Sequence, residues 1–96
     1  MGTRTAQTGN VVDGVTITVT AKRNVFGRST FSVLLEGDLL TLAGMNQRRG
    51  EVQKPTPEQT KASLGQIMLK NYPNREKVLA VTDTMLGQVE KEVGTN

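Results

Sequence analysis

The side chains of this sequence that could do chemistry are mostly cationic or hydroxylic, and the usual catalytic types are scarce. The chain contains no histidine and no cysteine. Their absence removes the usual general base near neutral pH, the thiol nucleophile and the commonest metal ligands. Three carboxylates, Asp13, Glu36 and Asp38, lie in segments with turn character, where solvated acids are ordinary. We therefore expect a protein that is not an enzyme and that has no cofactor and no metal site.

The polar residues that point to a function form two basic clusters. Arg48 and Arg49 are adjacent, and Lys22, Arg23 and Arg28 form a second group. The first 50 residues carry six cationic and three acidic side chains, whereas the remaining residues carry six of each, so the net charge of +3 belongs to the first half. Such cations suit phosphate oxygens, and neighbouring hydroxyls and amides suit the edges of bases. A solvated surface without a ligand is the alternative interpretation.

The elements that must position these side chains begin with strands. Val15–Ala21 alternates strictly between apolar residues and threonine, which predicts a strand with one dry face and one hydroxyl-lined face. Ser29–Leu35 repeats the alternation. We expect a short strand over Thr3–Gln7 and a third one over Leu39–Met45, the latter after a tight turn at Glu36–Asp38.

The middle of the chain is less regular. Two prolines at a spacing of two exclude a helix interior or a central strand around them, so we expect a long loop over 46–59. The next segment, 60–72, fits a helix and a strand about equally. Thr56 followed by Pro57 is a helix-start signal, whereas Gly65 lies in mid-segment and the polar and apolar residues also alternate.

The clearest helix is Arg75–Val93. Its apolar residues recur at spacings of three and four and form one stripe, and Gly94 is a natural C-terminal stop. Strands followed by a helix indicate an α+β fold. We expect a single domain over 1–96, with an antiparallel sheet drawn from 1–72 and the helix packed on a sheet.

The core available to a monomer is small. Ninety-six residues with only three aromatic side chains leave a lone chain marginal, which favours an oligomer. We expect the helix to pack on the sheet of a dimer partner. The predicted interface residues are Val78, Leu79, Met85, Leu86 and Val89. The sequence shows neither an apolar run near the ~20 residues of a membrane span nor a signal-peptide pattern, so we expect a soluble, intracellular or particle-associated protein without a membrane partner.

The order of these patterns resembles that of the coat proteins of single-stranded RNA bacteriophages. Thr8–Gly14 and the strand after it look like the N-terminal hairpin of that family, and 46–59 looks like its long loop between central strands. Thr60–Leu69, then Tyr72–Glu76 and the helix, look like its last strand running into the C-terminal helical region. The chain departs from the family in being shorter, in lacking at least one middle strand and in having one expected helix where the family has two.

The resemblance implies an obligate homodimer whose two sheets join edge to edge, with the helix of each subunit lying across its partner's sheet. Many dimers close into an icosahedral shell, and the opposite sheet face contacts genomic RNA, including a hairpin. The implied location is the virion, with the host cytoplasm during assembly. The resemblance also favours a strand over 60–72.

Under that strand interpretation, a set of polar residues would share the RNA-binding face and its rim. The predicted RNA-binding residues are Thr41, Arg48, Arg49, Lys61, Gln66 and Lys70. The alternative hypothesis is a small, basic, dimeric nucleic-acid-binding or accessory module that forms no shell. Neither hypothesis includes a small-molecule substrate.

Overall fold

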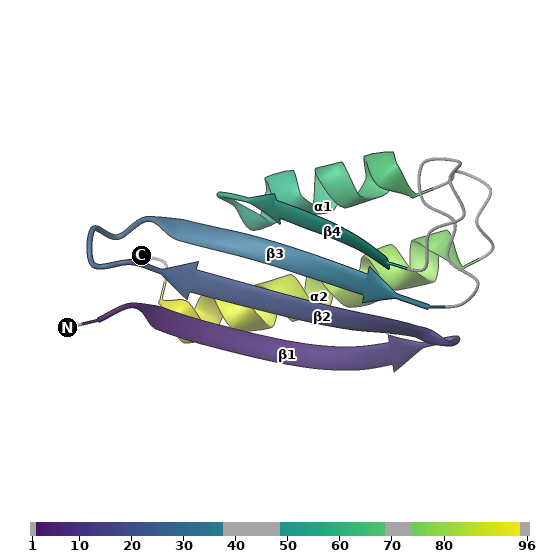
Figure 1. The fold of residues 1–96 in the computed structure, drawn as a ribbon, viewed down its shortest axis with the longest axis horizontal. Coiled ribbons are helices and arrows are strands. Elements are labelled where there is room, and N and C mark those ends of the chain that lie inside the picture. The colour runs from purple at the N-terminus through teal and green to yellow at the C-terminus, as the bar shows by residue number, and fades with distance from the viewer. Residues whose placement is uncertain (1, 38–48, 69–73, 95–96) are drawn as a thin grey trace.

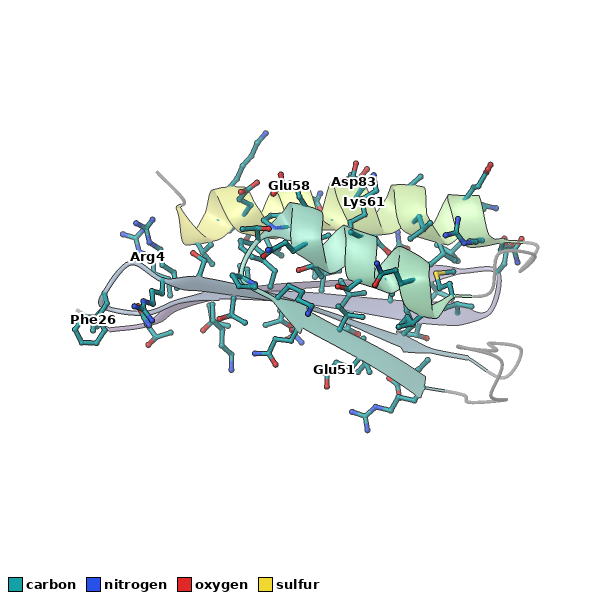
Figure 2. The ribbon with its side chains drawn as sticks, turned by 90° about the horizontal axis from the view of Figure 1, so that it is seen from above. Arg4, Phe26, Glu51, Glu58, Lys61 and Asp83 are labelled. Carbon is teal, nitrogen blue, oxygen red and sulfur yellow. The ribbon has the colours of Figure 1, made fainter. Side chains whose placement is uncertain are left out.

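Four antiparallel strands and two helices make up this α+β protein. The computed structural model describes residues 2–37, 49–68 and 74–94. The strands follow each other in the sheet in the order in which they occur in the chain, and both helices lie on the same side of it (Figures 1 and 2). The strands are β1 (Arg4–Val12), β2 (Val15–Arg23), β3 (Ser29–Glu36) and β4 (Arg49–Lys54), and the helices are α1 (Pro57–Ile67) and α2 (Arg75–Val93).

The first hairpin is set by a two-residue turn. Asp13 and Gly14 both have positive φ, 48° and 83°, and Val12 pairs directly with Val15 on either side of them. An Asp-Gly pair with positive φ at both positions is the preferred turn between twisted antiparallel strands. The turn fixes which residues of β1 and β2 face each other, and hence which side chains share a face.

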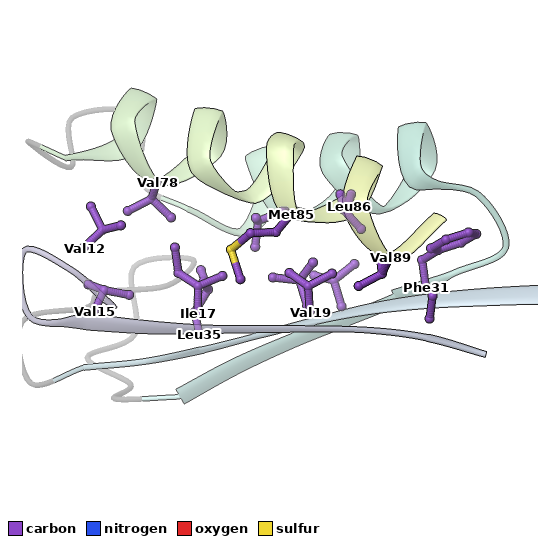
Figure 3. Packing of buried hydrophobic residues seen from close by; sticks show 14 of the residues in the cluster. Val12, Val15, Ile17, Val19, Phe31, Leu35, Val78, Met85, Leu86 and Val89 are labelled. Carbon is purple, nitrogen blue, oxygen red and sulfur yellow. The ribbon is translucent and has the colours of Figure 1, made fainter. Parts of the chain in front are cut away.

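The sheet buries one face because its apolar residues recur with period two. On β2 and β3 the inward residues are fully buried, whereas the residues between them are half-buried or exposed. Figure 3 shows these side chains meeting those of α2. The buried apolar residues are Ala6, Val12, Val15, Ile17, Val19, Ala21, Phe31, Val33, Leu35, Val52, Leu64, Met68, Val78, Met85, Leu86, Val89 and Val93.

α2 covers β1 and β2 with the stripe expected from its sequence. The helix ends where Gly94 adopts the left-handed conformation, with a φ of 71°, and donates its backbone N–H to the carbonyl of Glu90. Asn74 precedes the helix but makes no side-chain capping bond. The boundaries of this helix confirm the sequence-based prediction. Among the described residues, no helix is long and apolar enough to cross a membrane.

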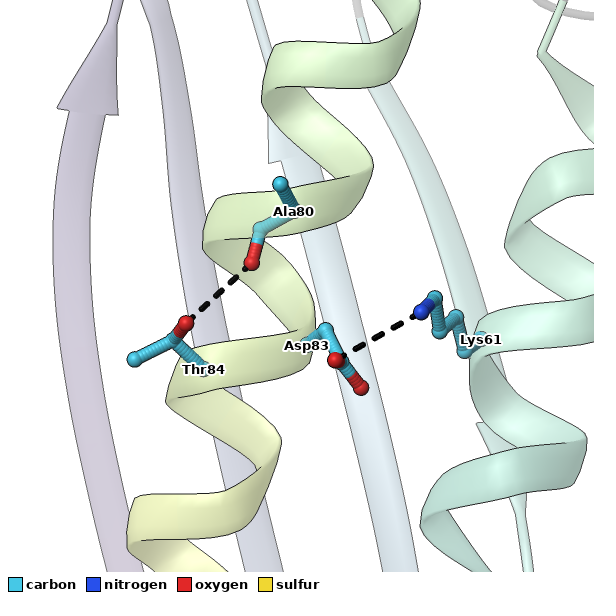
Figure 4. A network of polar contacts seen from close by, with 4 residues as sticks. All are labelled: Lys61, Ala80, Asp83 and Thr84. Carbon is cyan, nitrogen blue, oxygen red and sulfur yellow. Dashed lines mark hydrogen bonds and ion pairs between the residues drawn. The ribbon is translucent and has the colours of Figure 1, made fainter.

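α1 covers the β3–β4 side of the same face. Thr56 caps it by accepting a hydrogen bond from the backbone N–H of Gln59 at 3.1 Å, and Pro57 occupies the first turn. The helix is joined to α2 by an ion pair of 3.5 Å between Lys61 and Asp83 (Figure 4). At its C-terminal end, the guanidinium of Arg75 donates to the carbonyl of Gly65 at 2.9 Å.

Two expectations about the chain's elements are wrong, and a third has different bounds. The strand expected over 3–7 is present but extends to Val12, because the turn occupies only Asp13 and Gly14. The loop expected over 46–59 contains β4, whose residues pair with β3, and the start of α1. The strand favoured by the resemblance over 60–72 is instead helical as far as Ile67. The strand expected over 39–45 lies outside the described residues.

The five residues predicted for a dimer interface belong to the core of their own chain. Val78, Met85, Leu86 and Val89 are buried against the chain's own sheet, and Leu79 packs beside them. The stripe of α2 therefore finds its apolar partner without a second subunit. Packing of this helix on a partner's sheet stays a prediction, and this intramolecular contact does not require it.

Candidate nucleic-acid interface

The face of the sheet opposite the helices is lined mostly by polar side chains, and Val11 and Leu34 are its large apolar residues. The strand pairing places Gln7, Thr20, Ser32 and Gln53 side by side in one row across all four strands. A neighbouring row on the side of the β2–β3 connection joins Thr5, Lys22 and Thr30. Because alternate residues of a strand point to the same face, burial of the apolar set forces these polar residues outward together.

The rows enclose a shallow hollow of ≈ 430 Å³. Its walls carry hydroxyl, amide, ammonium and carboxylate groups, so it offers both donors and acceptors within a small area. Side chains of this kind can hydrogen-bond to base edges, to ribose hydroxyls and to phosphate oxygens. The lining residues are Thr5, Gln7, Thr20, Lys22, Thr30, Ser32, Glu51 and Gln53.

The charges on this face are balanced. Lys22 and Arg49 are its cations, and Glu36 and Glu51 are its anions, among the outward positions of the four strands. Arg49 lies directly opposite Glu36 in the pairing of β3 with β4. None of the outward positions of the four strands holds an aromatic residue. A ligand on the open face would therefore be held mainly by hydrogen bonds, with a small contribution from net charge.

The structure does not bring the six predicted RNA-binding residues together. Lys61 and Gln66 lie on α1, in the helix layer on the other side of the sheet. Only Arg49 of the described members lies on the open face. The remaining three, Thr41, Arg48 and Lys70, lie outside the described residues. The sheet face predicted for Lys61 and Gln66, with Arg49 at its rim, is wrong because it depended on a strand where the chain forms a helix.

Most residues of the hollow were missed by the sequence reasoning, although a signal for them exists. The threonines of β2 were assigned to the polar face correctly. Gln7 and Gln53 were not, because Arg4–Val12 and Arg49–Lys54 contain few apolar residues and so show weak alternation. The buried residues, Ala6 and Val12 in the first strand and Val52 in the second, mark the inward face, and their neighbours then point outward.

Neither a search for metal ligands nor comparison with known proteins assigns a function to this face. No group of three or more acidic residues capable of holding a metal ion occurs within the part of the chain that the structure describes. No protein-family model matches the chain, and neither the curated proteins nor the solved structures contain a match to it.

Proposed function

We propose that this protein binds single-stranded RNA through the open face of its sheet, as a structural coat protein of a small RNA bacteriophage. The observation that carries the RNA-binding part is the hollow of hydroxyl and amide groups on the sheet face opposite the helices. The proposal assigns the chain a binding and structural role and no catalytic one.

The chemistry of the hollow suits RNA whose bases are unpaired. An unpaired strand presents base edges and 2′-hydroxyls that a duplex largely hides, and threonine, serine and glutamine can donate to them and accept from them. The face has two cations, Lys22 and Arg49, balanced by two anions. With at most two phosphate contacts on this face, the logarithm of affinity should fall with the logarithm of salt with a slope of only about −1.4.

The coat-protein part rests on the resemblance of the sequence pattern to the phage family. In a shell of this kind the open face would look inward to the genome and the helix layer would look outward. We propose that homodimers are the building unit of the shell, which would be found in the virion and would assemble in the host cytoplasm. Purified protein should then elute as a megadalton species with a high ratio of absorbance at 260 nm to that at 280 nm.

A second candidate is the small nucleic-acid-binding or accessory module that forms no shell. It is favoured by the burial of the α2 stripe inside its own chain, since Val78, Leu86 and Val89 need no partner to leave water. A small species that binds RNA and does not assemble with it would select this candidate. A large, nucleic-acid-rich particle would select the coat protein.

The RNA-binding face is tested with two pairs of isosteric substitutions. Gln7→Glu with Gln53→Glu changes the hollow, and Gln66→Glu with Gln88→Glu makes the same change of charge on exposed positions of the helix layer. Each altered glutamine in the hollow loses a donor worth about 1 kcal/mol, so the first pair should weaken binding of unpaired RNA by roughly 30-fold. The second pair should change it by less than about twofold.

Filter binding of a random-sequence, unpaired RNA to wild type and to both pairs measures these affinities. Equal losses in the two pairs would assign the effect to total charge and would contradict the assignment of the face. Failure of the wild-type chain to bind RNA would overturn the RNA-binding proposal altogether.

A further inference from the structure

The connection between β2 and β3 presents the most exposed large apolar side chain of the described residues. Phe26 is 85% exposed, and Val25 beside it is 59% exposed. Figure 2 shows Phe26 projecting from the end of the molecule. An isolated exposed apolar side chain needs no explanation by itself. The construction of the turn around this one, and the charge near it, do point to a ligand.

The turn holds Phe26 in a defined position. The side-chain oxygen of Asn24 accepts hydrogen bonds from the backbone N–H groups of Phe26, at 2.9 Å, and of Arg28, at 3.0 Å. The backbone N–H of Asn24 donates to the carbonyl of Arg28, and that of Gly27 donates to the carbonyl of Asn24. These bonds pair Asn24 with Arg28 and leave a three-residue loop of Val25, Phe26 and Gly27 between them. Gly27, with a φ of 80°, closes this tight turn in the left-handed conformation. A fixed turn can present an aromatic ring at little entropic cost on binding.

The stretch of chain around the turn is cationic. Arg28 directly follows the turn and is exposed, and Lys22 lies on the open face where β2 enters the turn. The sequence between Asp13 and Glu36 contains no acidic residue. A second hollow, of ≈ 360 Å³, adjoins the turn, and it is lined by Gly2, Arg4, Arg23, Asn24, Val25 and Gly27.

The turn is also continuous with the polar hollow of the sheet. Lys22 lines that hollow and is two residues before Asn24, which anchors the turn. A strand of nucleic acid lying across the rows of the sheet could therefore extend to the ring without leaving the protein surface. The strand positions of the open face offer no aromatic ring, so the turn supplies the stacking surface that this face does not.

We propose that Phe26 is a stacking platform for one unpaired base of a single-stranded RNA, with Arg28 and Lys22 holding the flanking phosphates. This inference rests on the proposed RNA-binding function and extends it to a second contact point. Aromatic rings stack on any base, so the turn adds affinity without sequence preference. An exposed ring on a hydrogen-bonded turn in a cationic stretch of the chain fits a stacked nucleotide better than a bilayer, into which only two apolar side chains of the turn could insert.

Substitution of Phe26 separates stacking from general hydrophobic contact. Phe26→Ala should weaken binding of unpaired RNA by about 5- to 150-fold, the range found when a stacking aromatic is removed. Phe26→Leu keeps apolar area but has no ring, and it should lose a similar amount. Phe26→Tyr keeps the ring and should bind within about threefold of wild type. Arg28→Gln should make the slope of log affinity against log salt shallower by about 0.7. The control is Lys77→Gln, because Lys77 lies on α2 and is ion-paired at 3.2 Å with Asp13 of the β1–β2 turn, at the opposite end of the strands from Phe26; this variant should leave the slope unchanged.

A direct reporter is available because the chain contains no tryptophan. In Phe26→Trp the only indole lies at the β2–β3 turn, and its fluorescence emission should be quenched when unpaired RNA saturates the protein. Quenching by RNA that is absent with vesicles of phosphatidylserine and phosphatidylcholine supports the proposal. An emission change with the vesicles and none with RNA would overturn it in favour of a membrane contact.

The failures of the two proposals are distinguishable. RNA binding that is lost in the Gln7→Glu, Gln53→Glu pair but is equal in wild type, Phe26→Ala and Phe26→Leu would overturn the stacking platform alone. The same would follow if Phe26→Leu bound as tightly as wild type while Phe26→Ala did not. Absence of RNA binding by the wild-type chain would overturn both.

Discussion

Leu86→Ala tests whether the stripe of α2 closes the core of its own chain. Leu86 is 1% exposed and lies on the helix face that covers β1 and β2. Removing its three outer carbon atoms loses about 2.4 kcal/mol of transfer free energy, at ~0.8 kcal/mol for each. The cavity that remains adds about 1 kcal/mol, so the free energy of unfolding should fall by about 3 kcal/mol.

The matched control is Leu79→Ala on the same helix. Leu79 is only partly buried, so its truncation should cost about 1 kcal/mol. For a domain of this size 1 kcal/mol shifts the melting temperature by roughly 4–8 °C. Leu86→Ala should therefore melt about 12–24 °C below wild type, and Leu79→Ala about 4–8 °C below it.

Thermal unfolding followed by circular dichroism, with the size of each variant measured by light scattering, checks this prediction. Both residues were first assigned to a dimer interface, and the two arrangements predict different results. Own-chain packing predicts the large difference in melting temperature between the variants. A Leu86→Ala variant that keeps the wild-type melting temperature but dissociates from an oligomer to a monomer would refute own-chain packing. That result would place α2 in an interface between subunits.

Two further predictions concern the framework. Gly87→Ala should raise the free energy of unfolding by about 0.5–1 kcal/mol, because Gly87 is inside α2 and an added Cβ meets nothing within 4 Å. Gly37→Ala should lower the free energy of unfolding, because its Cβ would lie 2.9 Å from the carbonyl oxygen of Gly14. Urea unfolding of the two variants would show these opposite signs. Asp83→Asn removes the ion pair with Lys61. The side chain of Lys61 is 44% exposed and that of Asp83 is 60% exposed, so solvent screens the pair and its loss should lower the free energy of unfolding by less than about 1 kcal/mol. A loss above 2 kcal/mol in the same assay would contradict a solvent-screened pair.

The parts of the fold that followed from the sequence are those with strong periodicity. β2 and β3 alternate apolar and polar residues, and α2 repeats apolar residues at helical spacing, so both types of element and their buried faces were predictable. The residue types of Asp13 and Gly14 suit a turn with positive φ at both positions, but the strand expected over 3–7 ended too early to place it there. Each of these signals is local and does not depend on the rest of the chain.

The elements that were missed owe their structure to tertiary contacts. β4 has a single buried apolar residue, Val52, and its strand geometry comes from pairing with β3. α1 contains Gly65, and the alternation of its polar and apolar residues also fits a strand, so the cap at Thr56 did not decide between helix and strand. Thr60 and Leu64 of α1 are buried only because the helix packs against α2 and the sheet, which the local sequence does not reveal. The sheet placement predicted for Lys61 and Gln66 is wrong for this reason, since both lie on α1.

The distribution of charge explains why two contact points would serve one RNA better than the sheet face alone. The open face has equal numbers of cations and anions on its strands, so it attracts phosphates weakly and leaves selection to hydroxyls and amides. The β2–β3 turn lies in a stretch with no acidic residue between Asp13 and Glu36, so under this proposal it would attract any polyanion and offer an exposed ring to any base. Variants of Phe26 should therefore lower the affinity for all unpaired RNAs to a similar extent, whereas variants of Gln7 and Gln53 should lower it by amounts that differ from one RNA sequence to another.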